Sequence, residues 1–403
     1  MAFWNPLTCV TACLIVYSLG EWLSKKTKGA VASLLFACIL FLAGFWTGIL
    51  PKDVTTQSGL TTVMSNFGTA FMIVNIGSLI NLEELISEWK TVVIALCSIA
   101  AIALVCFTIG SWCFGREYAL IAAPPVAGST VAGIIVTAAA EAANRPELAA
   151  FAVLVLSFQK FFGIPISTTG IRTDLRAKLA AGYFDVDHKA SDKIKLPSMR
   201  IFKPNPNGMK SSIFLMGKIA VVACIADFVG KATLIPGSDP ANYILNPNIS
   251  YLLFGLIAAR IGFIDRDSLV RANGSGILTF GLLLMLPGSL AKVTPQAIAS
   301  MMIPVFGILL FCSIAICIVC GLVGKLLGYS PKVSAAIGAT CMLAYPATQI
   351  ITTEAVDSIE GMTEEQRQRA MDYALPKMII GGFVTVTIAS VIFAGVIGPM
   401  IFA

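Results

Sequence analysis

Hydrophobic residues follow one another in long runs that are separated by short polar breaks. A helix needs about 20 mostly apolar residues to cross a membrane. Ten runs approach or exceed that length, and each predicts a transmembrane helix: 7–23, 30–50, 61–80, 91–114, 147–168, 211–236, 249–264, 272–291, 300–327 and 374–402. Two further apolar runs, 118–143 and 333–356, are broken by proline and glycine. The pattern therefore predicts an all-α polytopic membrane protein.

Composition narrows the class of protein. Of 403 residues, 57% are hydrophobic and 12% are charged, whereas a soluble domain is about 45–50% apolar and about 25% charged. These values exclude a soluble enzyme, a disordered chain and a nucleic-acid binder. The eleven cysteines all lie in apolar runs and are interpreted as small core residues. A single histidine, His188, lies in a polar segment, so we expect neither a metal site nor a cofactor.

The two ends of the chain carry similar segments in the same order. Gly77-Ser78-Leu79 matches Gly288-Ser289-Leu290, Pro125 aligns with Pro346, and Lys160 aligns with Lys377. All the offsets fall between 210 and 221 residues. Weak internal symmetry with breaks at equivalent positions is typical of secondary transporters. We predict a repeat in 1–168, a basic loop in 169–210 and a second repeat in 211–403.

Charge placement predicts how the halves are oriented, because cytoplasmic loops are enriched in lysine and arginine. If 118–143 is a re-entrant hairpin and the N-terminus is outside, the basic clusters in 25–28 and 169–210 are both cytoplasmic. If 118–143 crosses fully, the halves are parallel and one cluster lies outside. We favour inverted halves, each with five crossings and one re-entrant hairpin or broken helix, and both termini outside.

The interruptions supply candidate substrate-binding residues. Irregular backbone at membrane depth is tolerated where protein or a water-filled cavity receives its polar groups. A half-helix N-terminus attracts a carboxylate, and exposed carbonyls suit Na⁺. The alternative is a proline kink that serine and threonine relieve. The candidates are Gly128, Ser129 and Thr130 in the first interruption and Thr348, Gln349 and Thr352 in the second.

Two lysines stand inside apolar runs. An intramembrane lysine costs about 2.5–3.5 kcal/mol on insertion scales, which favours a functional role. Lys160, beside Gln159, and Lys377 are candidates for pairing with a substrate carboxylate or replacing a cation. In the alternative interpretation both side chains extend to the membrane surface.

Several amide and hydroxyl side chains are candidates for a cation site. Asn66, Asn75, Asn273 and Thr353 offer oxygen ligands for Na⁺, although the asparagines could equally bridge helices. Asp227 and Lys231, four residues apart, are predicted to pair with each other.

The predicted architecture resembles the bacterial glutamate:sodium symporter family and the related 2-hydroxycarboxylate (citrate:sodium) transporters. The likeness covers nearly the whole chain. Those families carry Gly-Gly-x-Gly in both re-entrant loops, where this chain reads Pro125-Val-Ala-Gly128-Ser129 and Tyr345-Pro346-Ala-Thr-Gln349. The resemblance implies sodium-coupled transport of glutamate or another carboxylate.

We therefore expect a secondary active transporter rather than an enzyme. It would carry a small organic anion, coupled to Na⁺ or H⁺, across a bacterial inner membrane. The expected partners are that anion and the lipid bilayer, with no nucleic acid; a homodimer is compatible with the sequence. The alternative is a cation/proton exchanger that uses Glu141 or Glu354. A membrane-embedded enzyme or pump subunit would need a catalytic set or metal cluster, which the sequence does not display.

Overall fold

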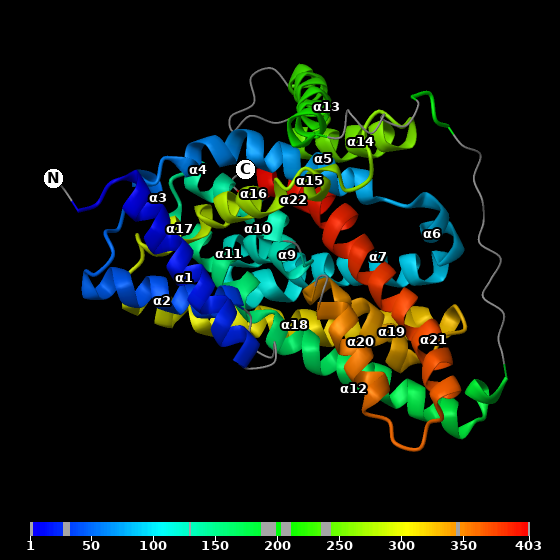
Figure 1. Cartoon of the computed structure of the whole chain (residues 1–403). Coiled ribbons are helices and arrows are strands. Elements are labelled where there is room, and N and C mark those ends of the chain that lie inside the picture. Colours follow the sequence, from blue (N-terminus) through cyan, green and yellow to red (C-terminus); the bar gives the residue numbers. More distant parts are fainter. Residues whose placement is uncertain are drawn as a thin grey trace.

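A computed structural model describes residues 3–26, 33–128, 130–186, 199–202, 211–234, 243–343 and 347–401 (Figure 1). Within these ranges the chain forms helices and no β-strand, apart from one isolated bridge between Leu234 and Tyr243. The all-α prediction is confirmed.

The main helices of the N-terminal half are α1 (Pro6–Lys26), α2 (Ser33–Thr47), α5 (Thr69–Leu79), α7 (Trp89–Val105), α9 (Arg116–Val126), α10 (Thr130–Ala142), α11 (Pro146–Phe158) and α12 (Lys160–Ala180). Short helices join them: α3 (Val54–Gln57), α4 (Leu60–Val63), α6 (Leu82–Ser87) and α8 (Ser111–Phe114). The C-terminal half holds α13 (Ser212–Ala232), α14 (Pro247–Arg260), α15 (Ser268–Arg271), α16 (Ser275–Leu283), α17 (Met285–Leu290), α18 (Pro295–Leu326), α19 (Pro331–Ala339), α20 (Ala347–Asp357), α21 (Glu364–Phe383) and α22 (Ser390–Ile401).

Six helical stretches in the described ranges are long and apolar enough to cross a membrane: Pro6–Lys26, Trp89–Phe114, Pro146–Ala180, Ser212–Ala232, Pro295–Leu326 and Glu364–Gly398. Each overlaps a predicted span. The other four predicted spans contain shorter helices, among them Ser33–Thr47 and Thr69–Leu79. The chain is a membrane protein with several helices capable of spanning.

Two helices extend beyond their predicted ends. Residues 169–180, predicted as the start of a polar loop, continue α12, because Ile171 and Leu175 are buried and turn one face of the helix into the core. Residues 364–372, which precede the apolar run predicted to begin at residue 374, open α21. A capping box formed by Thr363 and Gln366 begins that helix, which satisfies backbone N–H groups that would otherwise lack partners.

The first interrupted run folds into a helical hairpin made of α9 and α10. Pro124 and Pro125, predicted to stop a helix, lie in the last turn of α9, and Gly128 redirects the chain at a φ of +105°. Arg145, just after α10, donates to Glu117 at the start of α9, with one contact at 3.0 Å. A single continuous helix would separate those residues by roughly 40 Å. The outer ends of α9 and α10 therefore lie together.

The second interrupted run, α19 and α20, packs along α12. At its outer end Ser330 donates to Asp174, and residues 358–360 line a pocket with Arg176 and Leu179. At its inner end Met342 lies against Gly163, near the start of α12. Both outer ends of this pair therefore lie toward the C-terminal end of α12, whereas those of α9 and α10 lie at the start of α11.

The inner ends of the two interrupted runs meet near the junction of α11 and α12. Gly128, in the turn of the first hairpin, lies against the backbone of Cys341, in the 3₁₀ turn that follows α19. The pairs α9–α10 and α19–α20 thus approach each other from opposite ends of the α11–α12 segment.

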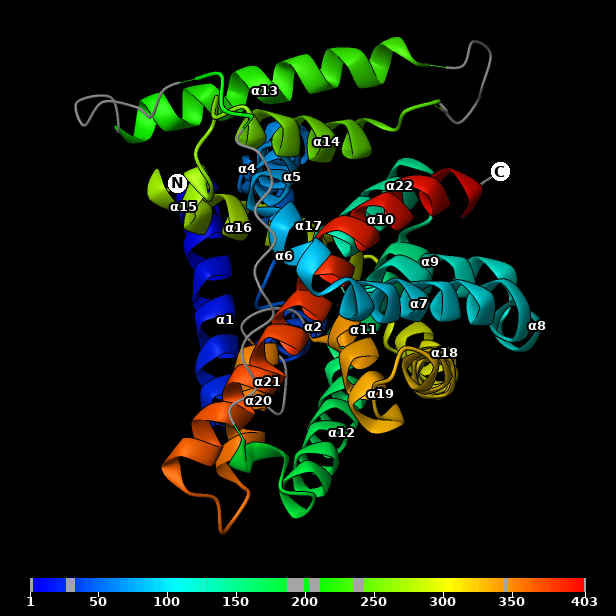
Figure 2. The ribbon, with the colours of Figure 1, turned by 90° about the vertical axis from the view of Figure 1, so that its right-hand side faces the viewer.

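The remaining helices surround this centre (Figures 1 and 2). α1 packs on α2 as α13 packs on α14, and α7 packs on α18. α5 and α14 cross closely at Gly77 and Gly255, where an added Cβ would come within 2.3 Å of a backbone oxygen of the other helix. Buried residues of α1, α2, α3 and α16 form a second hydrophobic core, although α2 and α16 also contribute Cys38, Leu42, Leu278 and Leu282 to the main one.

Candidate functional site

A cavity of about 740 Å³ lies between the two hydrophobic cores. One wall comes from the hairpin turn and from the junction of α11 and α12, together with Leu343 and Ala347. The opposite wall comes from α1, the start of α2 and α16. Four predicted substrate-binding residues line the first wall: Gly128, Thr130, Gln159 and Lys160.

Gln159 and Lys160 lie at the junction of α11 and α12, where the backbone stays helical: the N–H of Gln159 donates to the carbonyl of Val155 and the N–H of Gly163 donates to that of Gln159, both at 3.0 Å. Gln159 separates α11 from α12, and it is 4% exposed. Its side-chain oxygen has no hydrogen-bond partner among the described residues. Lys160 lines the cavity, and its ammonium has neither a hydrogen bond nor an ion pair within the same part of the chain. An unpaired buried amide oxygen costs about 1–3 kcal/mol of folding stability. The position of the Gln159 side chain therefore destabilises the ligand-free protein.

The opposite wall contributes residues that the sequence analysis missed. Tyr17, Ser18 and Glu21 of α1 face the cavity, as do Ser275 and Thr279 of α16. The hydroxyl of Tyr17 donates to the carbonyl of Leu283 at 2.6 Å, which ties α1 to α16. The polar side chains of Tyr17, Ser18 and Glu21 inside the first apolar run could have indicated a functional surface. The sequence around them does not show which other helices they face.

The electrostatics of the cavity are simple. Among its lining residues, Lys160 and Glu21 carry the formal charges, one on each wall. Thr130 begins α10, whose N-terminal N–H groups add positive potential near Lys160. The first wall therefore offers a cation and an acceptor, and the second offers hydroxyls and a carboxylate. Such a set can bind a small molecule that carries both an anionic group and a hydrogen-bond donor.

Other predicted substrate-binding residues lie outside the cavity. Thr348 is buried, and its carbonyl accepts from the hydroxyl of Thr352 at 2.7 Å, so both serve the helical turn of α20. Gln349 is exposed. Ser129 lies outside the described residues, and so does Pro346.

Lys377 belongs to a different polar network. Its ammonium donates to the carbonyl of Tyr373 at 3.1 Å and lies 3.9 Å from the Glu88 carboxylate. The hydroxyl of Tyr373 donates to buried Asp174 at 3.1 Å, and the hydroxyl of Ser330 donates to the same carboxylate. This cluster joins α21, α12 and the starts of α7 and α19 away from the cavity.

The structure does not gather the predicted cation-binding residues. Asn75 donates to Asp267 at 3.2 Å and accepts from the backbone of Leu269 at 3.0 Å, so it bridges two elements. Asn273 is an exposed residue in a left-handed turn. The hydroxyl of Thr353 donates to the carbonyl of Gln349 at 3.1 Å. The side chain of Asn66 is outside what the structure describes.

Other predicted residues fall as follows. Asp227 and Lys231 form the predicted ion pair at 2.8 Å. Glu141 lies at the end of α10 and Glu354 is exposed on α20; neither lines the cavity. Most of the cysteines are buried, as predicted, whereas Cys113 and Cys224 are exposed. The described residues contain no group of three side chains suited to a metal.

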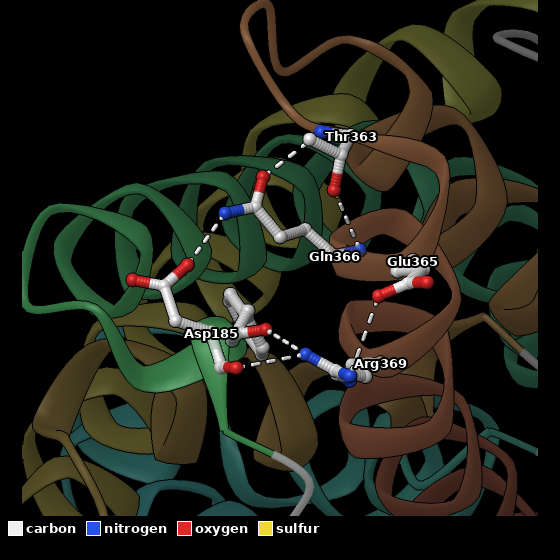
Figure 3. A network of polar contacts seen from close by, with 6 residues as sticks. Asp185, Thr363, Glu365, Gln366 and Arg369 are labelled. Carbon is white, nitrogen blue, oxygen red and sulfur yellow. Dashed lines mark hydrogen bonds and ion pairs between the residues drawn. The ribbon is translucent and has the colours of Figure 1, made fainter.

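A second polar cluster fastens the end of α12 to the start of α21 (Figure 3). The Gln366 amide donates to Asp185 at 2.6 Å, and its oxygen accepts from the backbone of Thr363 at 2.9 Å. Arg369 donates to the backbone carbonyls of Phe184 and Asp185 at 2.8 and 3.1 Å and pairs with Glu365 at 3.5 Å. Polar contacts therefore join the turn that follows α12, in the N-terminal half, to the start of α21, in the C-terminal half.

Neither a scan of the chain against protein-family models nor a search of curated proteins finds a match.

Proposed function

We propose that the protein is a secondary active transporter that carries a small organic anion by alternating access. The observation that carries this proposal is the pair of unsatisfied groups, the Lys160 ammonium and the Gln159 carbonyl, in a cavity between two hydrophobic cores. A ligand that satisfied both groups would recover the free energy that their isolation costs.

The arrangement of the interrupted runs supports an inverted repeat. Their outer ends lie at opposite ends of the α11–α12 segment, and their inner ends meet at Gly128 and Cys341. We infer two re-entrant hairpins that enter the bilayer from opposite sides, with five crossing segments in each half. We infer that segment 169–210 lies in the cytoplasm of a bacterial cell, because basic residues are enriched on that side of the membrane.

The second hydrophobic core, which α1 forms with parts of α2 and α16, supports motion of one wall against the other. A cavity between two bodies can open to alternate sides if one body moves as a unit. The ligand would contact the hairpin wall through its anionic group at Lys160. Alternating access then follows from movement of this wall past α1 and α16.

The cavity favours a carboxylate that also carries a donor, such as an amino acid or a hydroxy acid. The carboxylate pairs with Lys160, and an N–H or O–H group donates to Gln159. Glu21, on the facing wall, favours a ligand with an ammonium group, which makes amino acids such as glutamate the preferred class. Coupling to Na⁺ or H⁺ supplies the driving force for accumulation.

Uptake into proteoliposomes tests the proposal. Purified protein should accumulate at least one amino or hydroxy carboxylate when an inward Na⁺ or H⁺ gradient is imposed, and Lys160→Gln should abolish that uptake. Lys325→Gln, at an exposed lysine of α18, is the matched control and should transport normally. Failure to accumulate any member of a broad panel would refute the proposed function.

Thermal stability separates the coupling ion from the substrate. A ligand that binds the folded state raises its stability by an amount set by concentration and affinity. Stabilisation by substrate that grows on replacing K⁺ with Na⁺ at constant ionic strength would assign sodium coupling. If stabilisation by substrate instead increases when the pH is lowered, the coupling ion is H⁺.

A further inference from the structure

A second pocket, of about 320 Å³, lies away from the proposed transport cavity, at the end of α14. The segment 199–202 docks there: the N–H groups of Ile201 and Phe202 both donate to the carbonyl of Ile261, at 2.9 and 3.1 Å. The Phe202 ring packs edge-on against Phe263 at 5.2 Å. This central segment therefore closes one side of a pocket whose other sides come from α14 and the turn that follows it.

Three arginines line this pocket together with two carboxylates. Arg260 lies 3.6 Å from Glu83, and Asp265 lies 4.0 Å from Arg271, outside the pocket. Arg200 and Arg266 have no ion pair or hydrogen bond within the described part of the chain. Both carboxylates that line the pocket therefore already pair with an arginine. The guanidinium groups of Arg200 and Arg266 have no carboxylate partner among the described residues.

Apolar side chains surround the arginines. Met199, Ile201 and Phe202 are 61%, 77% and 44% exposed. In water this exposure is unfavourable, but at a membrane surface such side chains enter the acyl region while neighbouring guanidinium groups remain at the level of the headgroups. Arginine is well suited to phosphate because its planar fork can donate two parallel hydrogen bonds.

We propose that this pocket binds a phosphate group, and that its source is the headgroup of an anionic phospholipid, with Arg200 and Arg266 as the principal donors. Basic pockets beside membrane helices on the cytoplasmic side are suited to such headgroups. The site is independent of the transport cavity, so it stands or falls separately from the proposed carrier function.

Lipid retention on the purified full-length chain tests this site. The protein is exchanged into nanodiscs or detergent micelles containing phosphatidylglycerol or, as the neutral comparison, phosphatidylcholine. Bound lipid is measured by native mass spectrometry and stability by thermal denaturation. We expect selective retention of phosphatidylglycerol and a higher melting temperature with it.

The variant Arg200→Gln/Arg266→Gln should bind phosphatidylglycerol at least about tenfold more weakly, since two charge-assisted contacts are lost. Arg116→Gln/Lys325→Gln removes the same charge from exposed positions elsewhere and should bind normally. Arg200→Lys/Arg266→Lys keeps the positive charge but lacks the planar guanidinium fork. Its affinity for phosphatidylglycerol should lie between those of the other two variants. These three variants separate local recognition from a general effect of net charge and from misfolding.

Inorganic phosphate, titrated in a neutral-lipid background, identifies the source of the phosphate group. No thermal shift with phosphate supports a lipid headgroup. A shift that the glutamine variant abolishes supports the phosphate site but overturns its assignment to lipid. Equal retention of phosphatidylglycerol by the glutamine variant and the unsubstituted protein would overturn the site itself.

Discussion

Gly128 and Cys341 are in backbone contact although they belong to different halves of the chain. A Cβ added to Gly128 would lie 1.4 Å from the Cys341 carbonyl oxygen. The same glycine has a φ of +105°, which a residue with a side chain rarely adopts. Its lack of a side chain is therefore required twice, by the turn and by the neighbouring peptide.

Gly128→Ala should destabilise the protein more than an alanine at another left-handed glycine. The matched control is Gly59→Ala, where the backbone is left-handed with a φ of +72° and nothing lies within 4 Å of the added Cβ. The control carries the conformational cost alone, about 1–2 kcal/mol. Thermal denaturation in detergent measures both, and similar melting temperatures for the two variants would contradict the contact.

Gln159→Leu should stabilise the ligand-free protein while weakening ligand binding. The substitution removes a buried oxygen that has no partner and that costs about 1–3 kcal/mol. The same oxygen is the proposed acceptor for the substrate's donor group. Melting temperatures with and without the transported carboxylate provide the measurement. A variant that is less stable without ligand would indicate a structural partner for this amide.

Labelling can test whether the outer ends of α9 and α10 share one side of the membrane. Glu117→Cys and Arg145→Cys, each made after Cys113 and Cys224 are replaced by serine, should react with an impermeant maleimide from the same side of the vesicle. In the double cysteine variant a short bifunctional reagent should join the two positions, because their native side chains are in contact. Reaction from opposite sides would mean that α9 and α10 cross the membrane as one broken helix.

Tyr373→Phe should cost about 1–3 kcal/mol of stability. The hydroxyl that it removes donates to Asp174, which is 3% exposed and also accepts from the hydroxyl of Ser330. A double-mutant cycle with Ser330→Ala should give a coupling energy, since both hydroxyls serve one carboxylate. Additive effects in thermal denaturation would argue against a shared site.

Composition and hydrophobic runs predicted the helical membrane class and the location of both interruptions. Side-chain burial was harder to predict, because it depends on contacts between distant segments. Residues 169–180 are polar in sequence, yet α12 continues through them, since Ile171 and Leu175 are buried and α12 packs against α19. Gln349 was predicted to bind substrate, but its position on the helical turn makes its side chain exposed on the surface of α20.

The candidate site was predicted in part for the same reason. Gly128, Thr130, Gln159 and Lys160 lie within a short stretch of sequence and share one wall. The facing residues, among them Tyr17 and Thr279, are brought there by packing between α1 and α16. Lys377 matches Lys160 in the internal alignment, but Glu88 and Tyr373 surround it, and those partners come from tertiary packing and the helix register.

The contact between Gly128 and Cys341 also has a consequence for biosynthesis. The two residues are separated by 213 positions in the chain (341 minus 128). At a synthesis rate of about 5–20 residues per second, Cys341 is made roughly 10–40 s after Gly128. During that interval the first hairpin, with Gln159 and Lys160 beside it, lacks the segment that packs against its turn in the folded protein. The nascent N-terminal half must therefore be held by lipid, water or the insertion machinery until translation supplies the surface against which it folds.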